Sequence, residues 1–201
     1  MIRLFLIIAL ILSINQVFAQ DTLLNNKIQG ISISYFGENL THYGIKIGTE
    51  YSLKITNKTK IKRNLKEIPK RKEHFITGNI GSYIHKRNHV GLFINSELGY
   101  RKTRNNGFKY EFLIGVGYLH TFLQGDTYTV SDDGTVDKVN LAGQSNLMIP
   151  ISCGLGYDFN YHYKKPFSIN LKPSFFIQYP YNHAIAIRPT IDLGLFYYFR
   201  K

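Results

Sequence analysis

Histidine, hydroxyl and acidic residues are the groups in this chain that could carry hydrolytic or acid–base chemistry. His120 stands next to Thr121, and His42 follows Glu38 by four residues, so each histidine could act as a base beside a second functional group. A hydroxyl nucleophile needs its base within hydrogen-bond reach, and the base needs a third group to orient it. The sequence pattern offers no serine, histidine and carboxylate at one height on one face. We therefore predict no catalytic residues and no enzymatic activity.

Metal binding is the second chemistry that these residue types could support. Histidine favours zinc or copper. Four histidines fall in or beside the connections between predicted strands: His42, His85, His89 and His183. The segment Asp132-Asp133-Gly134 with Asp137 has the composition of a calcium loop, but it lacks the complete ligand spacing and the terminal Glu. The tip of a hairpin is the better interpretation of that segment, and we predict no metal site and no cofactor.

A basic segment is the third chemically distinctive feature. The chain has a formal net charge of +12, and nine of the nineteen residues from Lys54 to Lys72 are basic. They are Lys54, Lys58, Lys60, Lys62, Arg63, Lys66, Lys70, Arg71 and Lys72. The cluster has no recognition helix and no accompanying aromatic platform, so nucleic acid is not predicted as a partner. We expect a solvated, flexible turn, with binding to lipid phosphates or to an acidic polymer as the alternative. Leu53, Ile55, Thr59 and Ile61 alternate loosely, so the segment could also hide another strand, but a ninth strand would put the chain ends on opposite sides.

The N-terminal residues have the order of a secretory signal peptide. Arg3 supplies a positive charge, Leu4 to Leu12 is an unbroken apolar run, and a small residue, Ala19, stands at the expected cleavage site. The run is too short for a membrane-spanning helix, which needs about 20 apolar residues. We predict that residues 1–19 are removed and that the mature chain starts at Gln20. With Cys153 as its single cysteine, the exported chain can form no internal disulfide.

The composition of residues 20–201 is that of one all-β domain. The chain has 15 Tyr, 14 Phe and 17 Gly, and Tyr and Phe favour pleated strands. No stretch after Gln20 keeps a 3.6-residue apolar period, which argues against helices. We predict eight strands, separated by segments rich in Asn, Asp, Gly and Pro. They are Ile28–Phe36, His42–Lys54, His74–His85, Val90–Arg101, Phe108–Leu123, Ser145–Phe159, Phe167–Tyr179 and Ile185–Phe199.

The two faces of these strands differ in a way that suggests a membrane barrel. One face of the sixth strand reads Leu147, Ile149, Ile151, Cys153, Leu155, Tyr157. Such a face of five to seven apolar residues can cross a hydrocarbon layer when the strand is tilted. The opposite faces carry five cations and five anions, which could pair inside a lumen. These are Lys46, Glu50, Glu97, Arg101, Lys109, Glu111, Asp158, Lys172, Arg188 and Asp192. For Asp192 we expect Arg188 or Lys172 as the partner.

Aromatic residues gather at the predicted strand ends, where two interfacial girdles would lie. With a periplasmic N-terminus, one girdle comprises Tyr51, Tyr100, Phe108, Tyr110, Tyr157, Phe159, Phe167, Tyr197 and Phe199. The outer girdle comprises Tyr35, Tyr43, Phe122 and Tyr179. The long polar connection from Gln124 to Gln144 then falls on the outer side, where such barrels keep their long loops.

Together with the C-terminal run from Gly194 to Phe199, these features resemble the small eight-stranded outer-membrane proteins, especially those of Bacteroidetes-type bacteria. The resemblance implies an antiparallel, up-and-down, transmembrane β-barrel in the bacterial cell outer membrane. It also implies contact with outer-membrane lipids and lipopolysaccharide, recognition of Phe199 by the barrel-assembly machinery, and a monomeric state. The implied role is structural, adhesive, lipid-stabilising or surface-binding, and the fold does not determine which.

The expected width of the barrel limits its function, and two alternatives to a non-enzymatic membrane barrel remain. Eight strands enclose just enough space for their own side chains, so the porin-like architecture should have no wide pore. Some barrels of this kind modify lipid A with a serine, a histidine and a carboxylate on the barrel surface, which leaves a lipid-modifying enzyme as one alternative. The other is a secreted soluble β-barrel that binds a small ligand, with its apolar faces turned inward.

Overall fold

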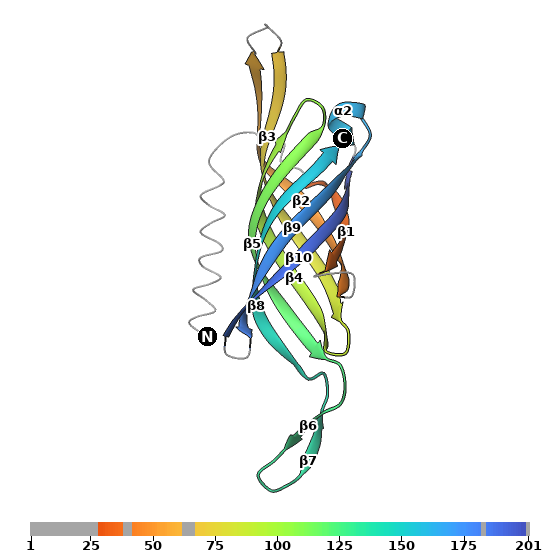
Figure 1. Cartoon of the computed structure of the whole chain (residues 1–201), viewed down its shortest axis with the longest axis vertical. Helices are drawn as coiled ribbons and strands as arrows, with labels where there is room; N and C mark the ends of the chain where they lie inside the picture. Colours follow the sequence, from red (N-terminus) through yellow and green to blue (C-terminus); the bar gives the residue numbers. More distant parts are fainter. Residues whose placement is uncertain (1–27, 38–41, 62–66, 182–183, 200–201) are drawn as a thin grey trace.

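The computed structural model describes residues 28–37, 42–61, 67–181 and 184–199 (Figure 1). The predicted signal peptide, residues 1–19, lies outside the described residues. In the part of the chain that is described, no helix has both the length and the apolar character needed to cross a membrane.

Eight long antiparallel strands form a closed barrel. They are β1 (Ile28–Gly37), β2 (Tyr43–Ile61), β3 (Glu67–His85), β4 (His89–Thr103), β5 (Phe108–Leu123), β8 (Gly143–Asp158), β9 (Phe167–Tyr181) and β10 (Ala184–Tyr198). Each strand pairs with its neighbours in the chain, and β1 closes the ring by pairing with β10, for example at Tyr35 and Leu193. The prediction of an all-β, up-and-down, eight-stranded barrel is therefore confirmed.

The strand connections differ strongly between the two ends of the barrel. A short hairpin of β6 (Thr127–Val130) and β7 (Val136–Val139) projects from one end, which we call the β6–β7 end. A tall ribbon made by β2 and β3 projects from the opposite end, which we call the β2–β3 end (Figure 1). The helix α2 (Phe159–Tyr163) and the C-terminus lie at the β2–β3 end as well.

The basic segment belongs to this ribbon, and our prediction of a long flexible turn there is wrong. Pairing of β2 with β3 continues past the barrel from Lys54 opposite His74 to Ile61 opposite Glu67. The physical reason is visible in the sequence, because Ile and Thr recur between the lysines at strand spacing and favour extended backbone. A projecting two-stranded ribbon is solvated on both faces, so lysines do not prevent pairing.

Two smaller boundaries also differ from prediction. The Gln124–Gln144 connection contains the β6–β7 hairpin instead of being wholly irregular. Phe159 begins α2 instead of ending a strand, because Asp158 caps the helix: its Oδ1 accepts hydrogen bonds from the backbone N–H groups of Asn160 (2.9 Å) and Tyr161 (3.1 Å). A left-handed residue, Lys164 at φ 58°, then ends the helix.

The barrel is apolar outside and polar inside. Leu147, Ile94 and Leu193 expose 45%, 59% and 52% of their surfaces on the outer wall, whereas Glu97 and Asp192 on the opposite faces expose 5% and 2%. A soluble barrel would turn these faces the other way round, so the alternative with an apolar interior is wrong.

Candidate functional site

The barrel interior contains the largest group of ionisable side chains. All ten predicted interior charges face the lumen, and eight of them are buried, with Lys172 and Arg188 partly exposed. The structure adds an eleventh, Glu73, which exposes only 2% of its surface. The sequence analysis missed Glu73 because the predicted third strand began one residue later, at His74. Glu73 continues the alternation of Phe75 and Thr77 along β3, so a predicted strand that began earlier would have placed it inside.

Arg101 on β4 is the centre of an ion network towards the β2–β3 end. Its guanidinium lies 2.7 Å from the Glu50 carboxylate, 2.6 Å from that of Glu111 and 3.5 Å from that of Glu73. The same guanidinium lies over the Phe75 ring, 4.2 Å from the ring centroid. Three strands therefore supply the carboxylates that neutralise one cation, and the planar fork of arginine suits this arrangement.

Further cations balance the excess of carboxylates around Arg101. The Lys109 ammonium lies 3.3 Å from Glu111 and donates a hydrogen bond of 2.9 Å to the Ser168 hydroxyl. Lys172 lies 3.7 Å from Glu111, and Arg71 lies 3.3 Å from Glu73. Buried charges are tolerated when they are paired in this way. The predicted pairing is thus confirmed for seven of the ten interior charges. Glu97 instead accepts hydrogen bonds from Thr77 and Asn95, and Asp158 accepts one from Tyr198.

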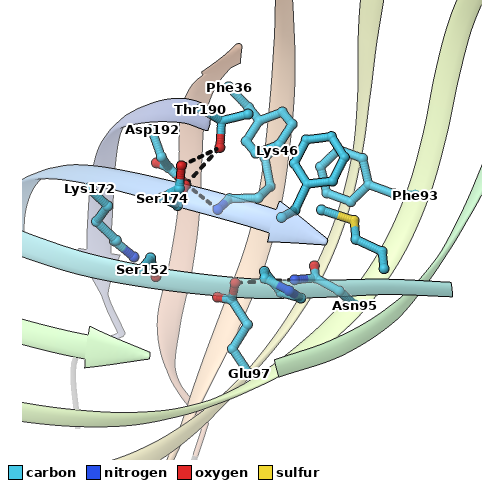
Figure 2. Close-up of a pocket in the computed structure, with 13 residues that line it drawn as sticks. Phe36, Lys46, Phe93, Asn95, Glu97, Ser152, Lys172, Ser174, Thr190 and Asp192 are labelled. Carbon is cyan, nitrogen blue, oxygen red and sulfur yellow. Dashed lines mark hydrogen bonds and ion pairs between the residues drawn. The ribbon is translucent and has the colours of Figure 1, made fainter. Parts of the chain in front are cut away.

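A second polar group lies nearer the β6–β7 end (Figure 2). Lys46 forms an ion pair with Asp192, which we did not predict. Of the two predicted partners, Lys172 lies directly opposite Asp192 in the β9–β10 pairing and interacts with it electrostatically. Arg188 donates instead to Gln178 at 3.1 Å. We did not predict Lys46 as a partner of Asp192 because the two residues lie on β2 and β10, which are separated by β1. At this level β1 carries the small side chain of Ser34, which leaves room for Lys46 to reach Asp192.

Apolar side chains close the lumen beyond this second group. Phe36, Phe93, Phe176, Met148, Tyr83 and Leu119 form one buried cluster. The cavity between this cluster and the polar groups has a volume of about 10 Å³. That volume is enough for about one water molecule. At this level the described lumen therefore has room for about one water molecule and not for a small ligand.

Three of the four predicted loop histidines converge at the β6–β7 end. His42 stacks on His85 with ring centroids 3.8 Å apart, and His85 lies 5.2 Å from His89. The hydroxyl of Tyr83 lies 3.4 Å from Nε2 of His89. His183 lies outside the described residues. Among the residues that the structure describes, no group of three or more His, Cys, Asp or Glu side chains could hold a metal ion.

The outer wall carries a serine–histidine contact that the sequence analysis missed. His120 on β5 lies directly opposite Ser145 on β8, and its Nδ1 is 3.0 Å from the Ser145 Oγ. The Tyr118 hydroxyl is 2.8 Å from the same Oγ. Thr121 faces the interior, as expected for the next residue in a strand. Only the pairing register, which our strand boundaries did not predict, could have revealed the contact.

This contact is incomplete as a catalytic site. Among the described residues, no carboxylate contacts His120, and Glu38, the predicted partner of His42, lies outside them. A serine–histidine pair can polarise a hydroxyl, but acyl transfer also needs an orienting group and oxyanion donors.

The aspartates of the β6–β7 hairpin form a turn, as predicted. Asp133 Oδ1 accepts hydrogen bonds from the Thr135 backbone N–H (3.0 Å) and hydroxyl (2.7 Å), and these bonds lower the pKa of Asp133. Gly134 adopts φ +81°, a left-handed conformation that glycine accepts without strain. The carboxylate is therefore used within the turn itself.

Comparisons with known proteins give one structural likeness. No protein-family model matches the chain, and no curated protein matches it. Among solved structures, the chain is similar to the N-terminal β-barrel domain of OprF from Pseudomonas aeruginosa, with 16% sequence identity and a TM-score of 0.46. The similarity covers 86% of this chain and 100% of the other. A likeness at this level of identity concerns the fold alone.

Proposed function

We propose that this protein is a non-enzymatic β-barrel of the bacterial outer membrane, with a structural or surface-binding role and no wide pore. The observation that carries the proposal is the outer wall, which exposes large apolar side chains on every strand of the barrel. Examples are Ile33, Ile47, Ile80, Ile94, Ile114, Leu147, Leu171 and Leu193, each at least 42% exposed. Soluble monomers rarely expose apolar patches larger than a few hundred Å², so this wall needs an apolar surrounding.

The interior supports the same proposal. Its charged side chains are mostly buried and form ion pairs or hydrogen bonds inside the barrel, which is the arrangement that a membrane barrel requires when polar residues face inward. The aromatic cluster around Phe93 and Phe176 fills one half of the lumen, and the Arg101 network occupies the other. A filled lumen agrees with a role that does not involve diffusion of solutes.

The ends of the barrel suggest an orientation with both chain ends in the periplasm. The strand ends carry aromatic side chains on the outer wall, including Tyr197 at the β2–β3 end and Tyr179 at the β6–β7 end, 45% and 53% exposed. Because long loops usually face outward, the β6–β7 hairpin would be extracellular. We further propose that residues 1–19 are the export signal, that Phe199 is read by the assembly machinery, and that the mature barrel is a monomer in contact with lipopolysaccharide.

The β6–β7 hairpin supports a surface-binding role. It exposes Tyr128, Val130 and Val136 by 56%, 68% and 62% of their surfaces, at the end of the barrel opposite the β2–β3 ribbon. A two-stranded hairpin is marginally stable in water when it packs on nothing. Exposed apolar side chains on such a ribbon are typical of a contact surface for a protein or for the cell envelope.

Fractionation and accessibility test the proposal together. The protein should sediment with outer membranes, resist extraction with urea, and migrate faster on a gel before boiling than after it. In a Cys153→Ser background, a membrane-impermeant maleimide should label Lys138→Cys in intact cells, and should label Lys165→Cys only after the outer membrane is opened. Recovery of the protein in the soluble periplasmic fraction, with a mobility that boiling does not change, would refute the proposal.

A further inference from the structure

We propose that the outward face of the β2–β3 end binds the phosphate groups of anionic phospholipids, through Lys54, Lys72, Lys102 and Arg104. This inference rests on the proposed membrane location. It adds a lipid class, phospholipids with net negative charge, and names the side chains that select it.

These cations lie next to one another at the same level of the sheet. Lys72 on β3 is directly opposite Lys102 on β4, and Lys54 on β2 is opposite His74, two residues from Lys72. Their inward-facing neighbours, Glu73 and Arg101, occupy the lumen, so Lys72 and Lys102 point to the outer wall. Arg104 follows in the turn after β4 and is exposed.

The four proposed cations have no counter-ion among the described side chains. Lys54, Lys72, Lys102 and Arg104 form no ion pair with any described carboxylate, whereas the nearby Arg71 reaches Glu73. The cross-strand neighbours Lys72 and Lys102 are like-charged, and the backbone of Lys58 is paired with that of Lys70. Like charges directly opposite one another destabilise a sheet. An external anion would remove this repulsion, and the protein itself supplies none here.

Aromatic rings hold two of the cations against the wall. The Arg104 side chain donates a hydrogen bond of 2.6 Å to the Tyr110 hydroxyl, and its guanidinium lies 5.2 Å from the centroid of that ring. The Lys102 ammonium lies 5.8 Å from the same centroid. Along β4 the outward residues thus pass from Leu98 to Tyr100 and then to Lys102. Apolar, aromatic and cationic residues follow in the same order across a bilayer interface.

The height of Lys72 and Lys102 favours a lipid over a soluble polymer. Lys102 is two residues beyond Tyr100, which is about 7 Å along a strand and about 5 Å along the membrane normal at a tilt of about 40°. The polar layer on each side of a bilayer is about 5–8 Å thick. If Tyr100 marks the edge of the hydrocarbon, both lysines therefore lie at the level of the phosphates. The rest of the ribbon extends beyond this layer.

Lipid selectivity in vesicles tests the inference. The purified full chain is folded into phosphatidylcholine vesicles that contain a trace of spin-labelled phosphatidylglycerol or spin-labelled phosphatidylcholine, and the motionally restricted fraction of each label is measured. The parent should prefer phosphatidylglycerol, and each cation near the surface contributes a factor of about five to the attraction. Lys72→Gln/Lys102→Gln removes two of the four cations and should therefore lower the preference by about 25-fold, with Lys54 and Arg104 retaining the rest. The matched control is Lys86→Gln/Lys138→Gln, which removes the same charge at the β6–β7 end and should keep the parental value.

Each outcome separates the inference from the proposed function. Failure of the parent to float with phosphatidylcholine vesicles after a urea wash would refute the membrane location itself. Stable insertion of the parent with equal motionally restricted fractions of the two spin-labelled lipids would refute only the lipid inference. Equal losses of the phosphatidylglycerol preference in Lys72→Gln/Lys102→Gln and in the control Lys86→Gln/Lys138→Gln would refute it as well. A third result would also overturn it: binding of soluble polyglutamate by the micelle-bound parent, lost in Lys72→Gln/Lys102→Gln, without any lipid preference. That result would assign the surface to an acidic polymer.

Discussion

Replacing Arg101 with methionine is the most direct test of the ion network in the lumen. Arg101 exposes 2% of its surface and contacts Glu50, Glu73 and Glu111. In Arg101→Met, Glu73 keeps Arg71, and Glu111 keeps Lys109 and Lys172. Among the described residues Glu50 forms no other ion pair, and it is left buried with only the more distant Lys109 and Lys172 to attract it.

The expected loss follows from the environment of Glu50. Removing one partner of a buried ion pair costs about 3–5 kcal/mol, because the remaining charge stays desolvated. Arg101→Met should therefore lower the free energy of unfolding by about 3–5 kcal/mol. Adding Glu50→Gln removes the stranded charge and should restore about 1–3 kcal/mol. The matched control, Arg87→Met in the exposed β3–β4 turn, should change stability by less than about 0.5 kcal/mol.

Equilibrium unfolding in detergent or vesicles measures these differences. The folded fraction at each denaturant concentration is read from heat-modifiable gel mobility, and the free energy is extrapolated to zero denaturant. A loss below about 1 kcal/mol for Arg101→Met would mean that the carboxylates are solvated and that the lumen is wet. A full loss without recovery in the Glu50→Gln double variant would mean that packing of Arg101 on Phe75, and not its charge, stabilises the barrel.

Three further predictions test the wall, the lumen and the outer rim. Leu193→Arg places a cation on the outer wall and should cost about 2–4 kcal/mol of folding free energy if the position lies near the membrane midplane. Asp192→Asn changes the lumen instead and should still assemble. If heat-modifiable mobility showed normal assembly of Leu193→Arg and failed assembly of Asp192→Asn, the assigned faces would be rejected. Purified protein in planar bilayers should show no large, stable single-channel conductance, and a persistent open level would contradict the filled lumen. A fluorophosphonate probe should not label Ser145, and labelling that Ser145→Ala abolishes would overturn the non-enzymatic assignment.

The barrel was predictable because a single periodicity determines most of it. Successive side chains along a strand point to opposite faces of the sheet. The outward position of Leu147 and the inward position of Glu97 therefore follow directly from the sequence. The number of strands followed from turn residues between the apolar runs. These features depend on local sequence and on the difference between water and hydrocarbon, and both are readable without knowing which strands pair.

Contacts between strands were less predictable, because they depend on register and on bulges. The shift between Ser52 and Lys54 changes which residues of β2 lie opposite β3, so that Lys54 lies opposite His74. The contact of His120 with Ser145 needs the β5–β8 register across the inserted hairpin. The β2–β3 ribbon was missed for another reason: its charge suggested a loop, although Ile and Thr at alternate positions favour a strand.

The filled lumen limits where any function of this protein can reside. With a cavity of about 10 Å³ and buried charges that pair with one another, the interior offers nothing to a solute. The chain nevertheless extends past the barrel at both ends, in the paired ribbon beyond Lys54 and in the hairpin around Val130. Neither extension helps to close the barrel, and one is strongly basic whereas the other exposes apolar side chains. Features that do not stabilise the barrel and that differ in chemistry between its two ends are best explained by contacts with two different surroundings. If the proposed membrane location holds, the eight strands would serve as a support fixed in the membrane, and the two extensions would carry the interactions.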